Sequence, residues 1–390
     1  MVGVSSLAPF LIGPRGALLQ QRATNQAESV LNEAIAVQQI AAPTFAEHRR
    51  AEYVAERLRA LPGVRDVATD KLDNVYARLP GDDPNVPAVL VTAHTDTVFD
   101  TETDLTVRRL PDRVMGPGLG DNSLGVAAML ALPSLLSDQP HRADLWLVAN
   151  SREEGLGDLG GIRAVLERLG TRVGSCIVLE GMAYGQVYHA GIAVRRLRIS
   201  VSAPGGHSWL HFGQPSAIHC LVRIAAQITQ LSVPESPRTT YNIGVIEGGR
   251  SVNSIATDAA FTLDLRSEET DALMALEKAV RDFCASPDGL FGCGVRIEVV
   301  GDRPAGKLPL THPLVDAARL ALEATGVHPA FRAGSTDANW PLSLGIPAIT
   351  VGITRGSNAH RLDEYIEVAP IGSGLWQTAL ITLVAAAGLG

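Results

Sequence analysis

Several features are scarce or missing in this sequence, and each absence excludes a class of protein. Only four cysteines occur among 390 residues and none form a CxxC pair, so no disulfide framework is expected. Asp and Glu outnumber Lys and Arg by 41 to 33, and the net charge of -8 argues against a nucleic-acid partner. No apolar run approaches the ~20 residues that cross a bilayer, so no membrane partner is expected.

The N-terminus also lacks a basic region ahead of its apolar stretch, so a secretory signal is not expected. The sequence therefore predicts a cytoplasmic protein whose thiols are reduced and mostly buried. Its length suits two domains, and 46% hydrophobic residues are ample for sizeable cores. The four thiols in question are Cys176, Cys220, Cys284 and Cys293.

Buried strands alternate with helices in the first half of the chain. Continuous apolar runs are typical of strands buried on both faces, and helical patterns separate them. This alternation predicts an α/β fold with a mixed, mostly parallel sheet flanked by helices. The expected strands are 88–94, 143–151, 176–181 and 346–353; the expected helices are 123–136 and 160–169, a final helix, and two helices broken at Pro43 between about Gln26 and Leu61.

The pattern changes after residue 190. Strands with one polar face and two helices follow in the order β-α-β-β-α-β, which is typical of a ferredoxin-like α+β unit. We therefore predict a discontinuous domain at 1–190 and 306–390, interrupted by an inserted domain at 191–305.

Polar residues that suit metal chemistry follow the first buried strand. His94 ends that strand, and Asp96 lies two residues on, so both side chains share one side and Asp96 can orient the imidazole ring. Asp121 lies in the glycine-rich loop GPGLGDN ahead of a helix. Taken alone, each has a plainer interpretation, as a core or surface pair for His94 and Asp96 and as a helix N-cap for Asp121.

More carboxylates follow the next two strands. Glu153 and Glu154 are adjacent, and their repulsion is relieved by a cation or a proton. Glu180 directly follows three apolar residues, and His360 follows the last buried strand. Because ligand sites in such sheets lie at the carboxyl edge of the strands, these residues are expected to meet there. Two histidines and several carboxylates suit zinc, and the surplus carboxylate favours two metal ions.

A competing interpretation exists for the same stretch. The pattern from Gly155 to Gly160 satisfies GxGxxG between a strand and a helix, with Glu180 twenty residues beyond, as in dinucleotide-binding proteins. Three carboxylates in or beside this loop, Glu153, Glu154 and Asp158, would repel a pyrophosphate, so we reject that interpretation. A serine hydrolase is less favoured still, because there is no GxSxG motif.

Taken in order, the motifs resemble one known family. They are AHTDTV, GPGLGDNSLG, SREEGLGDLGG, VLEG, GGHSW, GGRSVNSIA, LDLRS, GSTDAN and NAHRLDEYI. The chain resembles the co-catalytic metallopeptidases and amidohydrolases that include peptidase T, glutamate carboxypeptidase, acetylornithine deacetylase, succinyl-diaminopimelate desuccinylase and aminoacylase. The resemblance covers all but about the first thirty residues, and it implies a zinc-exopeptidase-like catalytic domain with a lid and dimerisation domain inserted.

The resemblance also implies roles for particular residues. Asp121 would bridge two divalent ions, zinc first, with cobalt or manganese as alternatives. His94 and Glu180 would complete one metal site, and Glu154 and His360 the other. Asp96 would orient His94. Glu153 would be the general base that deprotonates the attacking water and later protonates the leaving amine.

Further residues are implied to contact the substrate. His207 in the insert would reach the partner subunit's site in a homodimer and stabilise the oxyanion, unless it is a plain turn residue. Asn253, Arg266 and Thr336 would bind substrate, although Arg266 suits an internal salt bridge equally well and Thr336, like Asp337, suits a helix cap. Glu180 favours the acylase and carboxypeptidase branches, whereas the start of the insert looks more like a peptidase. The substrate stays open between a short peptide and an N-acyl amino acid. The alternative function is that of a catalytically silent relative that binds a metabolite or a partner.

Overall fold

The computed structural model describes residues 13–285 and 292–388. Its contacts divide the chain into two compact units. One unit takes in the chain up to Gly191 and again from Gly306 onward, and the other is Ile192–Ala305. Each unit has its own hydrophobic core.

The first unit is built on a mixed sheet. Its central strands β6, β3, β7 and β17 run parallel to one another, and antiparallel strands extend the sheet on both sides. The apolar runs predicted this core correctly, because β3 is buried along its whole length. In sheet order the strands are β1 (Arg65–Thr69), β2 (Val75–Leu79), β6 (Leu145–Asn150), β3 (Ala88–His94), β7 (Val173–Glu180), β17 (Ala348–Gly352), β8 (Gln186–Gly191) and β15 (Gly306–Lys307), with β16 (Ala330–Gly334) paired to β8.

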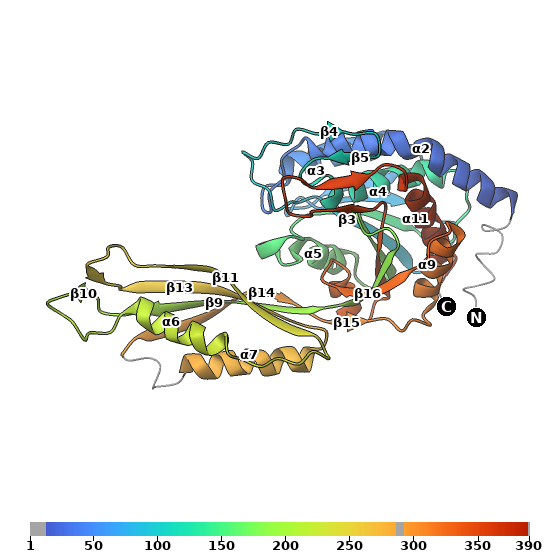
Figure 1. The fold of residues 1–390 in the computed structure, drawn as a ribbon. Helices are drawn as coiled ribbons and strands as arrows, with labels where there is room; N and C mark the ends of the chain where they lie inside the picture. Colours follow the sequence, from blue (N-terminus) through green and yellow to red (C-terminus); the bar gives the residue numbers. More distant parts are fainter. Residues whose placement is uncertain (1–12, 286–291, 389–390) are drawn as a thin grey trace. The chain divides into compact units, whose positions relative to one another are not determined.

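Helices cover both faces of this sheet (Figure 1). The chain passes from β3 through α4 to β6 and then back through α5 to β7. Because right-handed crossovers in opposite directions place their helices on opposite faces, α4 and α5 cover different sides. The helices are α2 (Pro14–Gln38), α3 (His48–Ala60), α4 (Leu124–Leu135), α5 (Gly160–Leu169), α9 (Pro313–Ala324), α10 (Asn339–Ser343) and α11 (Ile371–Ala386); short helical turns are η1 (Leu119–Ser123), η2 (Gly155–Gly157) and η3 (Gly170–Arg172).

A small second sheet lies in the same unit. In order it consists of β18 (Gly356–Ser357), β19 (Tyr365–Glu367), β5 (Arg113–Met115) and β4 (Arg108–Arg109). It joins the segment before Asp121 to the hairpin whose loop contains His360. Two candidate residues that are far apart in the sequence are thereby anchored to one support.

The second unit is a four-stranded antiparallel sheet with two helices. Its strand order β11-β13-β9-β14 and its β-α-β-β-α-β succession are those of a ferredoxin-like unit, so the predicted fold class is confirmed. Cys220 and Cys284 lie in its core. The elements are β9 (Ala193–Ser202), β10 (Gly206–His207), α6 (Ala217–Ile228), β11 (Thr239–Gly248), β12 (Ser254–Ile255), β13 (Asp258–Ser267), α7 (Thr270–Ala285) and β14 (Gly294–Arg303).

Some elements differ from the expectation. Helix α2 begins at Pro14, twelve residues before the expected start, with proline at its first helical position where the missing N–H costs nothing. Strands β1 and β16 were not expected, because they are short and only partly buried. All four cysteines are buried thiols, as predicted. In the part of the chain that is described, no helix is long and apolar enough to cross a membrane.

Candidate metal centre

Neighbouring parallel strands bring the candidate residues to one edge of the sheet. His94 is the last residue of β3, and Glu180 is the last residue of β7 beside it. On the other side of β3, β6 ends at Asn150 and leads into Glu153 and Glu154. Carboxyl ends of parallel strands meet at the same edge, which is where ligands bind in such sheets.

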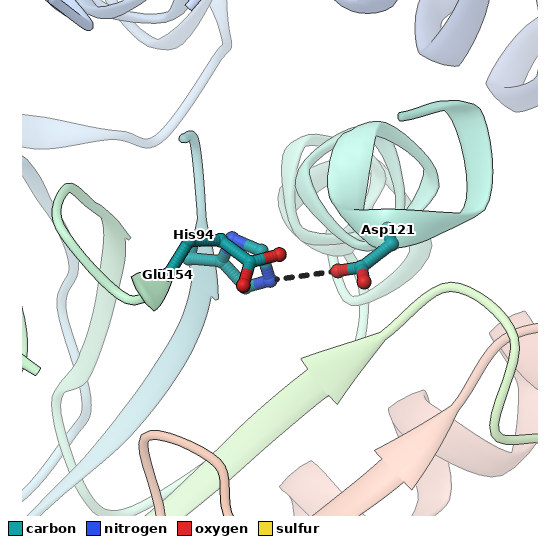
Figure 2. A group of neighbouring side chains, drawn as sticks. All are labelled: His94, Asp121 and Glu154. Carbon is teal, nitrogen blue, oxygen red and sulfur yellow. Dashed lines mark ion pairs between the residues drawn. The ribbon is translucent and has the colours of Figure 1, made fainter. Parts of the chain in front are cut away.

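Asp121 lies at the centre of the cluster. One carboxylate oxygen, Oδ1, is 3.1 Å from Nε2 of His94, and the other, Oδ2, is 3.1 Å from Nε2 of His360. Figure 2 shows the first of these contacts, with Glu154 beside the histidine ring. Asp121 does not cap α4, because the N-cap position of that helix is Ser123. Its carboxylate therefore connects two histidines rather than a helix terminus.

Two further carboxylates flank this centre. Oε1 of Glu154 lies 3.1 Å from Nε2 of His360, and Oε2 of Glu180 lies 3.8 Å from Nε2 of His94. Potential ligand atoms of His94, Asp121 and Glu154 all lie within 4.8 Å of one another. Imidazole nitrogens and carboxylate oxygens are the donors that zinc and similar divalent ions take. The donor set and its two-sided arrangement around Asp121 fit a pair of such ions.

The clustered groups change one another's pKa values. Burial raises the pKa of Glu180 to about 7. Hydrogen bonds to Asp121 and Glu154 raise the pKa of His360 to about 10. Burial opposes charge on His94, yet the carboxylates of Asp121, Asp96 and Glu180 raise its pKa well above the ordinary value. Burial also opposes charge on Asp121, but its bonds to the two histidines hold its pKa below the ordinary value. The shifts thus reflect direct electrostatic contact between the carboxylates and the two imidazole rings.

Asp96 supports the loop that carries the paired glutamates. Its Oδ1 accepts the backbone N–H of Glu153 and its Oδ2 that of Glu154, both at 2.9 Å. Thr44 donates its hydroxyl to the same Oδ2 at 2.9 Å. The contact expected from the sequence is longer, since Oδ1 of Asp96 lies 3.5 Å from Nδ1 of His94. Asp96 therefore links the His94 strand to the Glu153–Glu154 loop.

Glu153 is buried beside the cluster. Only 6% of its surface is exposed, and its charge raises the pKa values of Glu154, Glu180 and Asp337. It is therefore within electrostatic reach of both halves of the cluster. Its backbone is fixed through Asp96, as described above. A buried carboxylate in this position is suited to proton transfer.

Residues that hold the backbone around the cluster were not predicted from the sequence. Oε1 of Glu364 accepts the N–H groups of Gly120 and Asp121 at 2.6 and 3.1 Å, and Oε2 accepts that of Gly118 at 3.1 Å. Asn122 bonds to backbone on both sides of Glu180, at Leu179 O and Gly181 N. Glu364 lies within the motif NAHRLDEYI, but nothing in that motif signals bonds to a loop some 240 residues earlier.

Helix α3 contributes a second support. The buried Arg50 guanidinium donates to the carbonyl of Thr95, between His94 and Asp96, at 2.6 Å, and also to that of Ile40. Glu47 accepts the N–H of Arg152, just before the paired glutamates, at 3.0 Å. The start of α3 thus holds both segments that carry the cluster.

Replacing Glu364 by glutamine is expected to weaken metal binding about tenfold, as loss of outer support does at metal sites. The glutamine amide has one acceptor oxygen where the carboxylate has two. At least one N–H of the loop would therefore face the amide NH2, which is another donor. Competition with a fluorescent chelator measures the affinity. Glu367→Gln is the control, because Glu367 pairs with Arg355 on the surface of the same hairpin. Equal affinity in the two variants would contradict this role for Glu364.

The residues of the GSTDAN segment lie close to the cluster, but their side chains form hydrogen bonds with other protein groups. The hydroxyl of Thr336 lies 2.7 Å from that of Thr350 and accepts the N–H of Ala338 at 3.2 Å. Asp337 is fully buried and accepts a bond from Asn150 at 2.7 Å. Burial first, and then the charge of Glu153, raises its pKa well above the ordinary value.

Three further candidates belong to the second unit. His207 and Asn253 lie close together, because β10 pairs with β12 and the N–H of Ser208 bonds to Asn253 O at 3.1 Å. Arg266 on β13 forms an ion pair with Asp264 at 2.6 Å, which is the internal salt bridge considered as an alternative. Their contact with substrate stays a prediction.

Comparison with known proteins gives consistent matches. Residues 90–376 match the model of peptidase family M20/M25/M40. A Mycobacterium tuberculosis protein provisionally named succinyl-diaminopimelate desuccinylase DapE is 30% identical over 294 residues, covering 73% of this chain and 78% of that protein. Acetylornithine deacetylase of Myxococcus xanthus is 26% identical over 334 residues, covering 82% and 84%.

Solved structures share the fold. Aminopeptidase PepT from Bacillus cereus superposes with a TM-score of 0.74 at 21% identity, covering 92% of this chain and 99% of that one. The YXEP protein of Bacillus subtilis, whose structure is described as that of a dinuclear metal binding peptidase, gives a TM-score of 0.68 at 16% identity, covering 93% and 99%.

Proposed function

Because the chain belongs to peptidase family M20/M25/M40, we propose that it hydrolyses an amide bond of an N-acyl amino acid or short peptide with two divalent ions. As a member it is a hydrolase, either a deacylase or a peptidase, and the family indicated by its motifs is confirmed. The observation that carries the two-metal proposal is Asp121, whose two oxygens each face a different histidine.

This arrangement supports a role for each residue of the cluster. Asp121 would be shared, with His94 and Glu180 on one side and Glu154 and His360 on the other. Zinc suits these donors best, with cobalt or manganese as alternatives. Two bound ions would supply Lewis acidity that polarises the amide carbonyl and acidifies water. Glu153 would take the proton from the attacking water and return it to the leaving amine.

The second unit, Ile192–Ala305, has a proposed role of its own. We propose that it acts as a lid through which two copies of the chain associate, and that His207 stabilises the oxyanion in the partner subunit. Asn253, Arg266 and Thr336 would contact the substrate. A cytoplasmic location is proposed on the same footing as these roles.

Metal content and a substrate screen test the proposal. The protein is equilibrated with zinc, freed of excess and measured by plasma mass spectrometry; about two equivalents per chain are expected. The loaded protein is then assayed with N-acetyl and N-succinyl amino acids and with di- and tripeptides. Binding of one equivalent would mean that only one of the two proposed metal sites exists. No bound metal and no turnover would favour the silent, metabolite-binding alternative.

A dinucleotide-binding function is not supported. In the loop that satisfies GxGxxG, the residue before the first glycine, Glu154, donates its N–H to Asp96, and so does Glu153. Their side chains add negative charge beside the glycines, which repels a pyrophosphate.

A further inference from the structure

Arg152 directly precedes the proposed general base, and its backbone is tightly held. Its N–H donates to Glu47 at 3.0 Å, and its carbonyl accepts from Gly160 at 3.2 Å. Its φ is +55°, in the left-handed region that a non-glycine residue seldom occupies. Such conformations persist where the surroundings enforce them, and they gather at functional sites.

The guanidinium of Arg152 lacks the partner that arginine usually has. It lies over the ring of Phe45, 5.2 Å from the ring centroid, as a cation–π contact. Its Nε is buried without a hydrogen-bond partner, and among the described residues no carboxylate pairs with it. A buried N–H donor without an acceptor is unfavourable, so this guanidinium is not held by the hydrogen bonds that usually fix a buried arginine.

The surface beside this guanidinium is apolar and open to solvent. Phe45 is 57% exposed, Leu156 59% and Val98 44%. Their segments lie side by side: Thr44 N donates to Thr97 O at 3.3 Å, and a Cβ at Gly157 would come within 2.7 Å of the Thr44 side chain. Thr44 in turn bonds to Asp96. The apolar surface is thus continuous with the loop that holds the proposed base.

We propose that Arg152, together with Phe45 and Leu156, binds a carboxylate of the substrate that lies away from the scissile amide. An arginine fork binds a carboxylate through two parallel hydrogen bonds, and its stacking on Phe45 orients the fork. The aliphatic chain that bears the carboxylate would cover Phe45 and Leu156. This inference rests on the proposed amide hydrolysis and makes Arg152 a residue that determines specificity.

The carboxylate has two possible sources in such a substrate. It belongs either to the distal end of a dicarboxylic acyl group or to the amino acid that leaves. Four substrates separate them: N-succinyl-leucine, N-succinyl-leucinamide, N-valeryl-leucine and N-valeryl-leucinamide. Only the first has both carboxylates, and the last has neither.

Steady-state kinetics of Arg152→Gln on the four substrates test the inference. We expect KM to rise about tenfold or more for substrates that carry the recognised carboxylate, because a charge-assisted hydrogen bond is lost. The KM of the variant divided by that of the unaltered protein should stay near one for N-valeryl-leucinamide. For all four substrates, kcat should stay within a few-fold of the value for the unaltered protein. Arg152→Lys should restore part of the affinity, because it keeps the charge but not the fork. Arg168→Gln is the matched control. Arg168, in α5, also lies over an aromatic ring, that of Tyr76 in β2.

A binding measurement makes the test independent of turnover. Calorimetric titration of N-succinyl-leucine into zinc-loaded Glu153→Gln, with and without Arg152→Gln, gives the same comparison in a protein in which turnover is suppressed. If binding weakens only for the two succinyl substrates, Arg152 recognises the distal carboxylate of the acyl group. If it weakens only for the two leucine substrates with a free carboxylate, Arg152 recognises the carboxylate of the leaving amino acid. Equal effects on all four substrates, or no effect on any, would overturn the inference and leave the hydrolase proposal intact. If the unaltered chain binds no metal and turns over none of the substrates, the hydrolase proposal itself is overturned.

Discussion

Replacement of Glu153 by glutamine is expected to lower kcat about a thousandfold, within the range that general acid–base catalysis contributes. Glutamine keeps the size of the side chain and the backbone bond to Asp96, but it cannot accept a proton from water. The substitution leaves Asp121 and the two histidines that it contacts unchanged. The variant should therefore still bind two metal equivalents, and kcat at saturating substrate together with metal content checks both statements.

The matched control for this change is Glu167→Gln. Glu167 lies on the exposed side of α5, so the same charge is removed without touching the cluster. Near-normal turnover by Glu153→Gln would show that another group takes the proton. Loss of metal from the variant would instead mean that Glu153 is a ligand.

Replacement of Asp121 by alanine is expected to abolish hydrolysis and to reduce bound metal from two equivalents to less than one. Both halves of the cluster share its carboxylate, so one substitution removes a ligand from each. His360→Ala, by comparison, should remove only the half to which Glu154 belongs. Plasma mass spectrometry of the zinc-equilibrated variants distinguishes the two patterns.

Asp104→Ala serves as the control for Asp121→Ala, because Asp104 is exposed and accepts a hydrogen bond from nearby Thr106. Circular dichroism should show that both variants keep the native secondary structure. If Asp121→Ala retained two equivalents, a shared carboxylate would be ruled out.

Much of the fold and of the cluster could be predicted from the sequence because strand ends carry a clear signal. An apolar run such as 88–94 identifies a buried strand, and the polar residue that ends it must lie at the sheet edge. His94, Glu180 and the Glu153–Glu154 pair were therefore expected at one edge of the sheet, and they lie there in the structure. Short, half-exposed strands such as β1 give no such pattern and were missed.

Supporting residues were missed for a different reason. Glu364 and Arg50 act through backbone N–H and carbonyl groups, which every residue has, so their partners leave no trace in the sequence. The same holds for Arg152, because its significance comes from an absent partner and an exposed ring beside it. Only coordinates reveal which charged side chains lack a partner.

The order of strands in the central sheet means that neighbouring strands are synthesised at very different times. Strands β7 and β8 follow one another in sequence, yet β17, which comes more than 150 residues later, lies between them. Until β17 has been synthesised, one edge of β7 has no hydrogen-bonding partner in this sheet. The inserted unit can meanwhile fold, since all of its strands come from one continuous segment. A nascent chain in which β3 and β7 have already paired therefore keeps the other edge of β7 unpaired until β17 has been made.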